Sequence, residues 1–474
     1  MLGLFGTLNL AARSMQTQMA GVEVAGQNIA NVNTAGYSRQ RVNIQTTPSI
    51  GTAVGPEGTG AQVVKIEQVV NNLLDGQIQT QASTSGYWSA QQDGLQNAQN
   101  GLNEFLNGSG STLGTSATGT DTSGTGLSAQ LDQLFSAFQS VATSPTSVSE
   151  RQALIGKAQN LATSFNQISS KLGDLRTSLN TSLGNDVDSA NTLLTDIASL
   201  NSQISNAEAH GGNANDLRDA RTEDLKNLSQ LAKVTTSIGT NGAVNISISG
   251  QALVTGNKVS DSLTTYDAGN GQMLVKTANG SVPLTLTGGS MQGTIDARDG
   301  ELATMQTNVN SLAANLITAV NTVHSGGFSL TGSSGANFFS GTDAGNITVN
   351  ASLANNPSLI QLSGDATATG DNSVAKQLAA LATTAQSGLN NQTFTASYAA
   401  TVAGLGTALQ SANTHVTNET AVTNMLTTQR ASVSGVNVDE EMTNLISFQQ
   451  AYGASASLVK TIDAMMQVTL AMKV

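Results

Sequence analysis

Apolar positions follow a helical period along most of this chain, and the pattern is most continuous at its two ends. Near the C-terminus, apolar residues recur three, four or seven positions apart and predict one amphipathic helix from residue 437 to the end. A second stripe with the same period covers residues 4 to 29. Because neither helix has a partner nearby in sequence, we expect the two terminal helices to pair as a coiled coil.

The surface expected to drive self-assembly consists of these two stripes. In the N-terminal helix its residues are Leu4, Leu8, Met15, Met19, Val22 and Ile29, and in the C-terminal helix they are Val438, Met442, Leu445, Tyr452, Val459, Ile462, Met466 and Leu470. Arg13 and Glu23 are the only charged residues among the first 38, so the rest of the N-terminal helix is expected to contact other subunits. Asn437 is expected to cap the C-terminal helix, with Glu440 completing a capping box.

The interior of the chain is predicted to be mainly helical with one smaller β segment. Helical patterns cover residues 70–106 and continue from residue 127, and an apolar stripe from 154 to 204 predicts a single long helix despite Gly173 and Gly184. The period changes to two between residues 239 and 295, where Asn270-Gly271 indicates a hairpin.

The fold class expected from this pattern is an elongated, multi-domain protein that is mainly α with a smaller β part. Residues 1–36 and 437–474 would form the terminal coiled-coil assembly domain. Residues 37–238 and 296–436 would form an elongated long-helix bundle with extended segments and loops. Residues 239–295 would form a small inserted β domain.

Composition narrows the functional classes. Only 11% of the residues are charged and the net charge is −12, with no cluster of Lys and Arg, so nucleic acid is not an expected partner. The chain contains no cysteine, which excludes disulfides and thiolate chemistry. The sequence predicts neither a membrane-spanning segment nor a cleavable secretory signal.

Residue types that carry chemistry do not form a recognisable site. His210, His324 and His415 stand in no metal-binding frame, so neither a metal nor a cofactor nor a catalytic group is expected. The glycines at 55, 58 and 60 are read as a turn and not as a phosphate loop. The dense charges between Asp216 and Lys226 alternate in sign, and they predict a helix face held by salt bridges.

Two terminal segments resemble signatures of bacterial flagellar rod, hook and hook-associated proteins. One is GQNIANVNTAGYSRQRV, and the other is VDEEMTNLISFQQAYGASASLVKTIDAMM, from Val438 to Met466. The residues of this chain that carry the first signature are Asn28, Asn31, Asn33, Gly36, Tyr37, Ser38, Arg39 and Gln40. The order of the two segments, at opposite ends of one chain, is that of the axial protein family.

The middle of the chain resembles the hook-associated protein 1 branch of that family, the hook–filament junction proteins. The matching segments run from Leu127 to Phe165, from Asn215 to Leu231 and from Gly288 to Phe339. The resemblance implies a secreted structural protein, exported by the flagellar type III apparatus and assembled with copies of itself as a ring or helical layer. It also implies three partners, namely the hook protein, hook-associated protein 3 and a cytosolic export chaperone that covers the C-terminal region.

Two other functional classes remain open from the sequence. The chain could be another flagellar axial protein, namely hook-associated protein 3 or a hook or filament subunit. The turn from Tyr37 to Gln40 disfavours hook-associated protein 3 and a filament subunit, and the helical middle disfavours a hook protein. It could also be an enzyme or adhesin carried on axial-protein ends. A deep pocket lined by Asp, Glu and His in residues 239–375 would favour that alternative.

Overall fold

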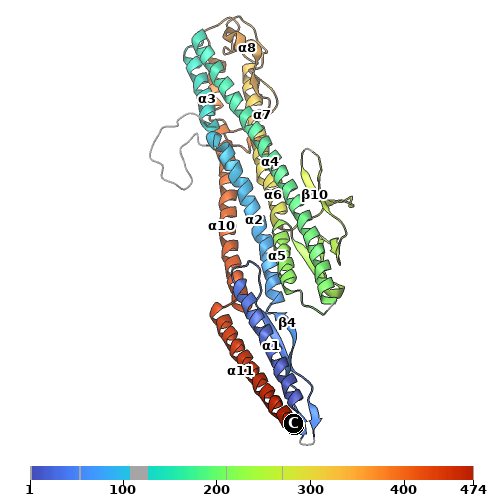
Figure 1. The fold of residues 1–474 in the computed structure, drawn as a ribbon. Helices are drawn as coiled ribbons and strands as arrows, with labels where there is room; N and C mark the ends of the chain where they lie inside the picture. Colours follow the sequence, from blue (N-terminus) through green and yellow to red (C-terminus); the bar gives the residue numbers. More distant parts are fainter. Residues whose placement is uncertain (1–2, 53–54, 107–125, 210, 270, 473–474) are drawn as a thin grey trace.

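The computed structural model describes residues 3–52, 55–106, 126–209, 211–269 and 271–472. The molecule is long and narrow, with the terminal helices α1 and α11 side by side at one end and a body of long helices above them (Figure 1). The expected fold class, mainly helical and elongated with a smaller β part, is confirmed.

The described residues form eleven α-helices, most of them in the body. They are α1 (Leu4–Ala30), α2 (Asn72–Leu106), α3 (Leu127–Thr143), α4 (Val148–Ala209), α5 (Asn215–Leu231), α6 (Gly289–Asp296), α7 (Ala303–His324), α8 (Ala351–Asn355), α9 (Ser373–Ala380), α10 (Phe394–Ser434) and α11 (Val438–Ala471). A π-helical turn (Ala297–Leu302) joins α6 to α7.

The strands are short and form several small antiparallel sheets. They are β1 (Gln40–Thr46), β2 (Ile50–Thr52), β3 (Gly55–Glu57), β4 (Ala61–Gln68), β5 (Val234–Ile238), β6 (Val244–Ile248), β7 (Gln251–Thr255), β8 (Lys258–Val259), β9 (Leu263–Asp267), β10 (Met273–Thr277), β11 (Phe339–Ser340) and β12 (Thr348–Val349). Strands β5 to β8 form one four-stranded sheet in sequence order, and β1 pairs with β4, β2 with β3, β9 with β10 and β11 with β12.

Helix α4 runs through the body and contributes to both of its hydrophobic cores. It runs unbroken for 62 residues, as the stripe from 154 to 204 predicts, and one side of it is buried throughout. Its first half, up to Leu179, belongs to a core shared with α2, α3, α7, α9 and α10, whereas its second half, from Leu183, packs against α5, α6 and the β sheet. Two hydrophobic cores therefore share one continuous helix.

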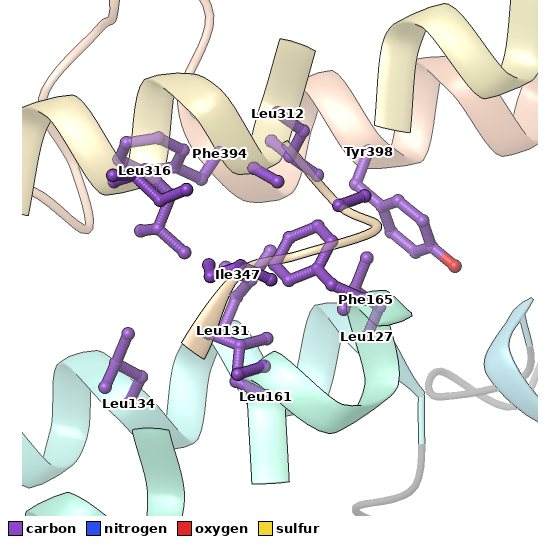
Figure 2. Close-up of a cluster of buried hydrophobic side chains, with 14 of the residues drawn as sticks. Leu127, Leu131, Leu134, Leu161, Phe165, Leu312, Leu316, Ile347, Phe394 and Tyr398 are labelled. Atoms are coloured by element: carbon purple, nitrogen blue, oxygen red, sulfur yellow. The ribbon is translucent and has the colours of Figure 1, made fainter. Parts of the chain in front are cut away.

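The core around the first half of α4, the upper core, joins side chains that are far apart in sequence. Figure 2 shows Leu127, Leu131 and Leu134 of α3, Leu161 and Phe165 of α4, Leu312 and Leu316 of α7, Ile347, and Phe394 and Tyr398 of α10. All ten are buried. At roughly 1.5–3 kcal/mol for each large side chain buried, this cluster is a main source of the body's stability.

The β segment differs from its predicted limits at both ends. Strand β5 begins at Val234, before the predicted start at residue 239. The sequence does not mark this strand because it lies at the edge of the sheet, where Val234 is half-buried and its other residues are exposed, so apolar and polar residues hardly alternate. At the other end, α6 begins at Gly289. The hairpin between β9 and β10 is present, with Asp267 paired to Met273, although Asn270 itself lies outside the described residues.

Glycine allows α2, α5 and α6 to approach one another closely. A Cβ atom on Gly86 of α2 would lie 2.1 Å from the backbone oxygen of Gln230, and one on Gly293 of α6 would lie 2.2 Å from that of Tyr87. Neither position can hold a larger residue unless the backbones separate. These contacts fix α2 against the lower half of the body.

His324 joins three segments in the upper core. Its ring is fully buried, its Nδ1 lies 2.8 Å from the backbone oxygen of Ala336, and its Nε2 accepts a hydrogen bond from the backbone N–H of Gln361. This arrangement requires the neutral ring, with the proton on Nδ1. Burial lowers the pKa of His324 to about 4, and the positive charge of Arg151 adds to the effect.

We expect the body to lose stability as the pH falls from about 6.5 to about 4. Over that range the unfolded chain binds a proton at His324 and the folded chain does not, so protonation favours unfolding, by about 3 kcal/mol at pH 4. Urea unfolding measured across this range in the parent and in His324→Gln checks the prediction. The variant should show a flatter dependence, and parallel curves for the two proteins would contradict it.

Candidate assembly site

The terminal helices α1 and α11 run antiparallel along one another (Figure 1). The hydroxyl groups of Ser14 and Ser455 lie 2.8 Å apart, and seven residues along each helix Gly21 lies under the ring of Phe448. A Cβ on Gly21 would come within 2.7 Å of that ring, so the pair requires glycine there. The expected pairing is present, and knobs-into-holes packing stays a prediction.

The predicted residues of α11 do not all face α1. Ile462 is buried, and Leu445, Val459 and Met466 are half-buried, whereas Val438, Met442, Tyr452 and Leu470 are exposed. The buried and half-buried positions of α11 are Glu441, Asn444, Leu445, Phe448, Ala451, Ser455, Ala456, Val459, Ile462 and Met466, and among them Phe448 and Ser455 contact α1. The single apolar stripe expected from the sequence is thus divided between an inner and an outer face.

The predicted residues of α1 are also divided. Met19 is exposed, while Leu4, Leu8, Met15, Val22 and Ile29 are half-buried. The fully buried positions of α1 are Ala11, Thr17, Gly21, Val24, Ala25 and Asn28.

Part of the surface of α1 that was expected to meet other subunits is covered within the chain. Strands β1 and β4 pack on α1, and the Thr17 hydroxyl donates to the backbone oxygen of Ala61. The sequence had placed residues 37–70 with the helical body, but their paired strands lie against this terminal helix. The turn expected at Gly55 and Gly60 is present, since both have positive φ.

Exposed apolar side chains gather at this end of the molecule. Among the described residues, all but four of the large hydrophobic side chains that are exposed lie in residues 5–73 or 422–472. The outer face of α11 carries Met442, Ile446, Leu458, Met465 and Val468, between 42% and 58% exposed. Apolar patches of this kind mark surfaces that other proteins cover.

A turn after α1 joins the terminal pair to the body, and Asn28 holds it. Asn28 is fully buried, and its side chain donates to the backbone oxygen of Gln40 (2.8 Å) and accepts from the Gln40 N–H (2.9 Å). The Tyr37 hydroxyl donates to the same Asn28 oxygen. Burial and the carboxylates of Asp216, Asp219 and Glu441 raise the pKa of Tyr37 to about 12, so the phenol keeps its proton as a donor.

Three helices of the body converge on this turn. The N–H of Ser38 donates to Asp219 of α5 (2.9 Å), and the Gln40 side chain donates to Asp216. Arg430 of α10 donates to the backbone oxygen of Gly36 and to the Ser38 hydroxyl, and its guanidinium pairs with Asp75 of α2. Burial raises the pKa of Asp219, although its bonds to Ser38 and the charge of Arg430 oppose the shift.

Arg39 connects the turn to α11. Its guanidinium lies 2.8 Å from Glu440 and 2.7 Å from Glu441. The backbone N–H of Arg39 donates to the backbone oxygen of Ser434. Asn437 caps α11 as expected, accepting from the N–H groups of Asp439 and Glu440. The capping box is not completed as predicted, because the Glu440 carboxylate binds Arg39 instead.

The other signature residues shape the end of α1. Asn31 is the C-cap and its side chain donates to the backbone oxygen of Gln27, while Asn33 is exposed. Gly36 has φ +79°, a conformation that glycine adopts without strain. A Cβ there would meet Glu223 of α5 at 3.4 Å. The structure thus brings Asn28 and residues 36 to 40 together and leaves Asn33 outside the contacts.

The sequence did not predict which side chains of the body bind the turn after α1. Lys226–Glu223 is an ion pair of the kind expected within the charged helix, whereas Arg218 pairs with Glu208 of α4, and Asp216 and Asp219 bind the turn. Asp75 and Arg430 were not singled out at all. Their one sequence signal is that each is an isolated charge in a long uncharged stretch.

We expect Asn28→Ala to loosen the turn. The substitution leaves the N–H and carbonyl of Gln40 buried without their partner, at about 1–3 kcal/mol for each group. Hydrogen exchange at the Gln40 amide should speed up at least tenfold. Asn33→Ala is the matched control, an exposed asparagine of the same signature, and it should leave exchange unchanged. Equal exchange rates in the two variants would contradict this role for Asn28.

The described residues offer little that resembles a catalytic or metal site. They contain no group of three or more His, Asp or Glu side chains placed to hold a metal ion. A cavity of about 450 Å³ lies between α2, α4, α5 and α6, and its carboxylates are Asp93 and Asp186, whose pKa values are raised by burial. No histidine lines this cavity. No helix within the described part of the chain is long and apolar enough to span a bilayer.

The fold and the site define an elongated, mainly helical protein whose two chain ends pair and expose apolar side chains. Residues 114–339 match the family described as the helical domain of flagellar hook-associated protein FlgK, and residues 432–472 match the C-terminal family of the flagellar basal body rod proteins FlgEFG. These matches make the chain similar to flagellar hook-associated protein 1, with the FlgK helical domain in its middle. The resemblance seen in the sequence is confirmed.

Relatives align with this chain along nearly its whole length. Flagellar hook-associated protein 1 of Bacillus subtilis (strain 168) is 28% identical over 516 residues, covering 98% of this chain and 98% of the relative. The protein of that name from Escherichia coli (strain K12) is 23% identical over 552 residues, covering 96% and 98%. The flagellar hook junction protein FlgK from Burkholderia pseudomallei shares the fold, with a TM-score of 0.60, 17% identity and coverage of 76% of this chain and 100% of that one.

Proposed function

We propose that this protein is a structural component of the bacterial flagellum that forms the junction between hook and filament. The observation that carries the proposal is the gathering of exposed apolar side chains on the terminal pair. Apolar surfaces of this kind mark sites that other proteins cover, and identical copies offer the same surface. Two relatives that match along nearly the whole chain are named flagellar hook-associated protein 1. A solved structure that covers 76% of this chain is described as that of a flagellar hook junction protein.

The neighbours in this account are copies of the chain, the hook protein on one side and hook-associated protein 3 on the other. The protein acts outside the cell, after export by the flagellar type III apparatus without signal cleavage. Before export, a cytosolic chaperone covers the C-terminal region. The exposed apolar face of α11 supports this last partner, because an uncovered surface of that kind would aggregate in the cytosol.

An enzyme or adhesin delivered on axial-protein ends is the competing class. The cavity beside α2 is polar and holds two carboxylates, but the pocket expected for that class would combine Asp, Glu and His in residues 239–375. Only Ser290 and Thr294 of those residues line this cavity. This cavity is therefore not the pocket expected for that class.

Electron microscopy of a strain that lacks this protein tests the proposal. The expected result is cells with complete hooks, few or no attached filaments, and filament protein shed into the medium. Expression of the parent chain in that strain should restore filaments. Normal filaments in the deletion strain would exclude the junction role, and the absence of hooks would point to a rod or hook protein instead.

A further inference from the structure

Two arginines connect the ends of the chain to each other in a reciprocal way. Arg39 lies near the N-terminus and binds Glu440 and Glu441 at the start of α11. Arg430 lies near the C-terminus and binds the turn after α1 through the Gly36 carbonyl and the Ser38 hydroxyl. Each guanidinium therefore comes from one end of the chain and binds groups of the other end.

Arg39 also uses its backbone, so that a single residue contacts three elements. Its N–H donates to the Ser434 carbonyl at the end of α10, and its carbonyl accepts from the N–H of Val69, just before α2. The side chain then reaches the first turn of α11. The link between α10 and α11 contains only residues 435 to 437, and Gly435 approaches the Ala431 carbonyl so closely that a Cβ there would lie 2.2 Å from it.

We propose that Arg39 and Arg430 form a latch that fixes the direction of the terminal helix pair relative to the body. They are positioning residues, since their contacts join elements of this chain. The proposal deepens the proposed function, because subunits can form a regular layer only if the assembly surface leaves every body at the same angle.

The electrostatics of the latch favour the arrangement in which the Arg39 guanidinium lies against Glu440 and Glu441. Glu441 is 3% exposed, so its carboxylate needs the guanidinium in place. A guanidinium presents several N–H groups in a fixed plane and can bind Glu440 and Glu441 together, which the single ammonium of lysine does less well. When the Arg39 side chain is absent, the helices α1 and α11 can still pack along their inner faces. The pair then keeps only the contacts of the turn after α1 with α5 and α10, so its angle varies more widely at residues 435 to 437.

Spin-label distance measurements on the free chain test the latch, and the absence of native cysteine makes labelling specific. One label is placed by Asn418→Cys on α10 and the other by Ser457→Cys on α11, both at exposed positions. The parent should give one narrow distance distribution, and Arg39→Ala should broaden it at least twofold. Arg41→Ala is the matched control, because Arg41 is 70% exposed and pairs only with Glu67 on the neighbouring strand.

A second variant separates positioning from local stability. Arg39→Ala leaves the Glu441 carboxylate buried without its partner, which by itself destabilises the start of α11. Arg39→Ala with Glu441→Gln removes that charge, so hydrogen exchange in the first turn of α11 should return toward the parent rate while the distance distribution stays broad. A narrow distribution in either variant, or a broad one in the parent, would overturn the proposal. These outcomes do not depend on where the protein acts, so they leave the junction role to its own test.

Discussion

Val468→Asp is expected to prevent the protein from assembling while leaving it folded. Val468 lies on the outer face of α11 and is 58% exposed, so the substitution should change the stability of the free chain by about 0.5 kcal/mol or less. If a neighbouring subunit covers this face, the carboxylate loses its water, at several kcal/mol. Each 1.4 kcal/mol weakens association about tenfold, so association should fall at least 100-fold.

The measurement is the fraction of hooks that carry a filament in a deletion strain expressing the variant, together with the amount of variant in the medium. We expect few filaments and normal or raised secretion. Val148→Asp is the matched control: Val148 is 50% exposed but begins α4, where an acidic residue suits the helix N-terminus. It should retain filaments, and equal filament retention in the two variants would exclude this face from assembly.

Ile462→Asp is expected to act earlier, by separating α1 from α11 within a single chain. Ile462 is 4% exposed and lies on the inner face of α11. Loss of its buried side chain and burial of a carboxylate together cost about 3–5 kcal/mol, more than a two-helix pair without its neighbours can sustain. Hydrogen exchange throughout α1 and α11 should become at least 100-fold faster, while the thermal unfolding of the body stays unchanged.

Thr461→Asp is the control for this variant, since Thr461 directly precedes Ile462 in the sequence but is exposed. It should leave exchange in α1 slow. Leu445→Asp should have a smaller effect than Ile462→Asp, because Leu445 is only half-buried. Slow exchange in α1 of the Ile462→Asp protein would mean that the helix pair does not depend on this inner face.

Periodicity in the sequence was sufficient to predict the long elements. The stripes at both ends correspond to α1 and α11, and the stripe from 154 to 204 lies within the unbroken α4. Periodicity could not divide α11 into inner and outer faces, because apolar residues occur on both. Ile446 and Val468 face outward while Phe448 and Ile462 face α1, and only the position of the partner helix distinguishes them.

The turn after α1 and its contacts with the body could be predicted only in part. The resemblance pointed to residues 28 to 40, yet their partners Asp219 and Arg430, and Asp75, which pairs with Arg430, come from three helices that meet only in the folded chain. The helix containing Asp219 was predicted to hold its charges in local ion pairs, as Lys226 does with Glu223. Local spacing cannot show that a carboxylate accepts a backbone N–H 181 positions away, as Asp219 does from Ser38.

Methionine oxidation shows whether other subunits cover the outer face of the terminal pair. Met442 and Met465 are 46% and 54% exposed in the free chain, and Met291 is fully buried. Mild peroxide converts exposed methionine to its sulfoxide, and mass spectrometry gives the rate at each position. We predict that Met442 and Met465 react quickly in the free protein and slowly, like Met291, in purified hook–filament junctions. Equal rates at Met442 and Met465 in the free and assembled protein would contradict the account.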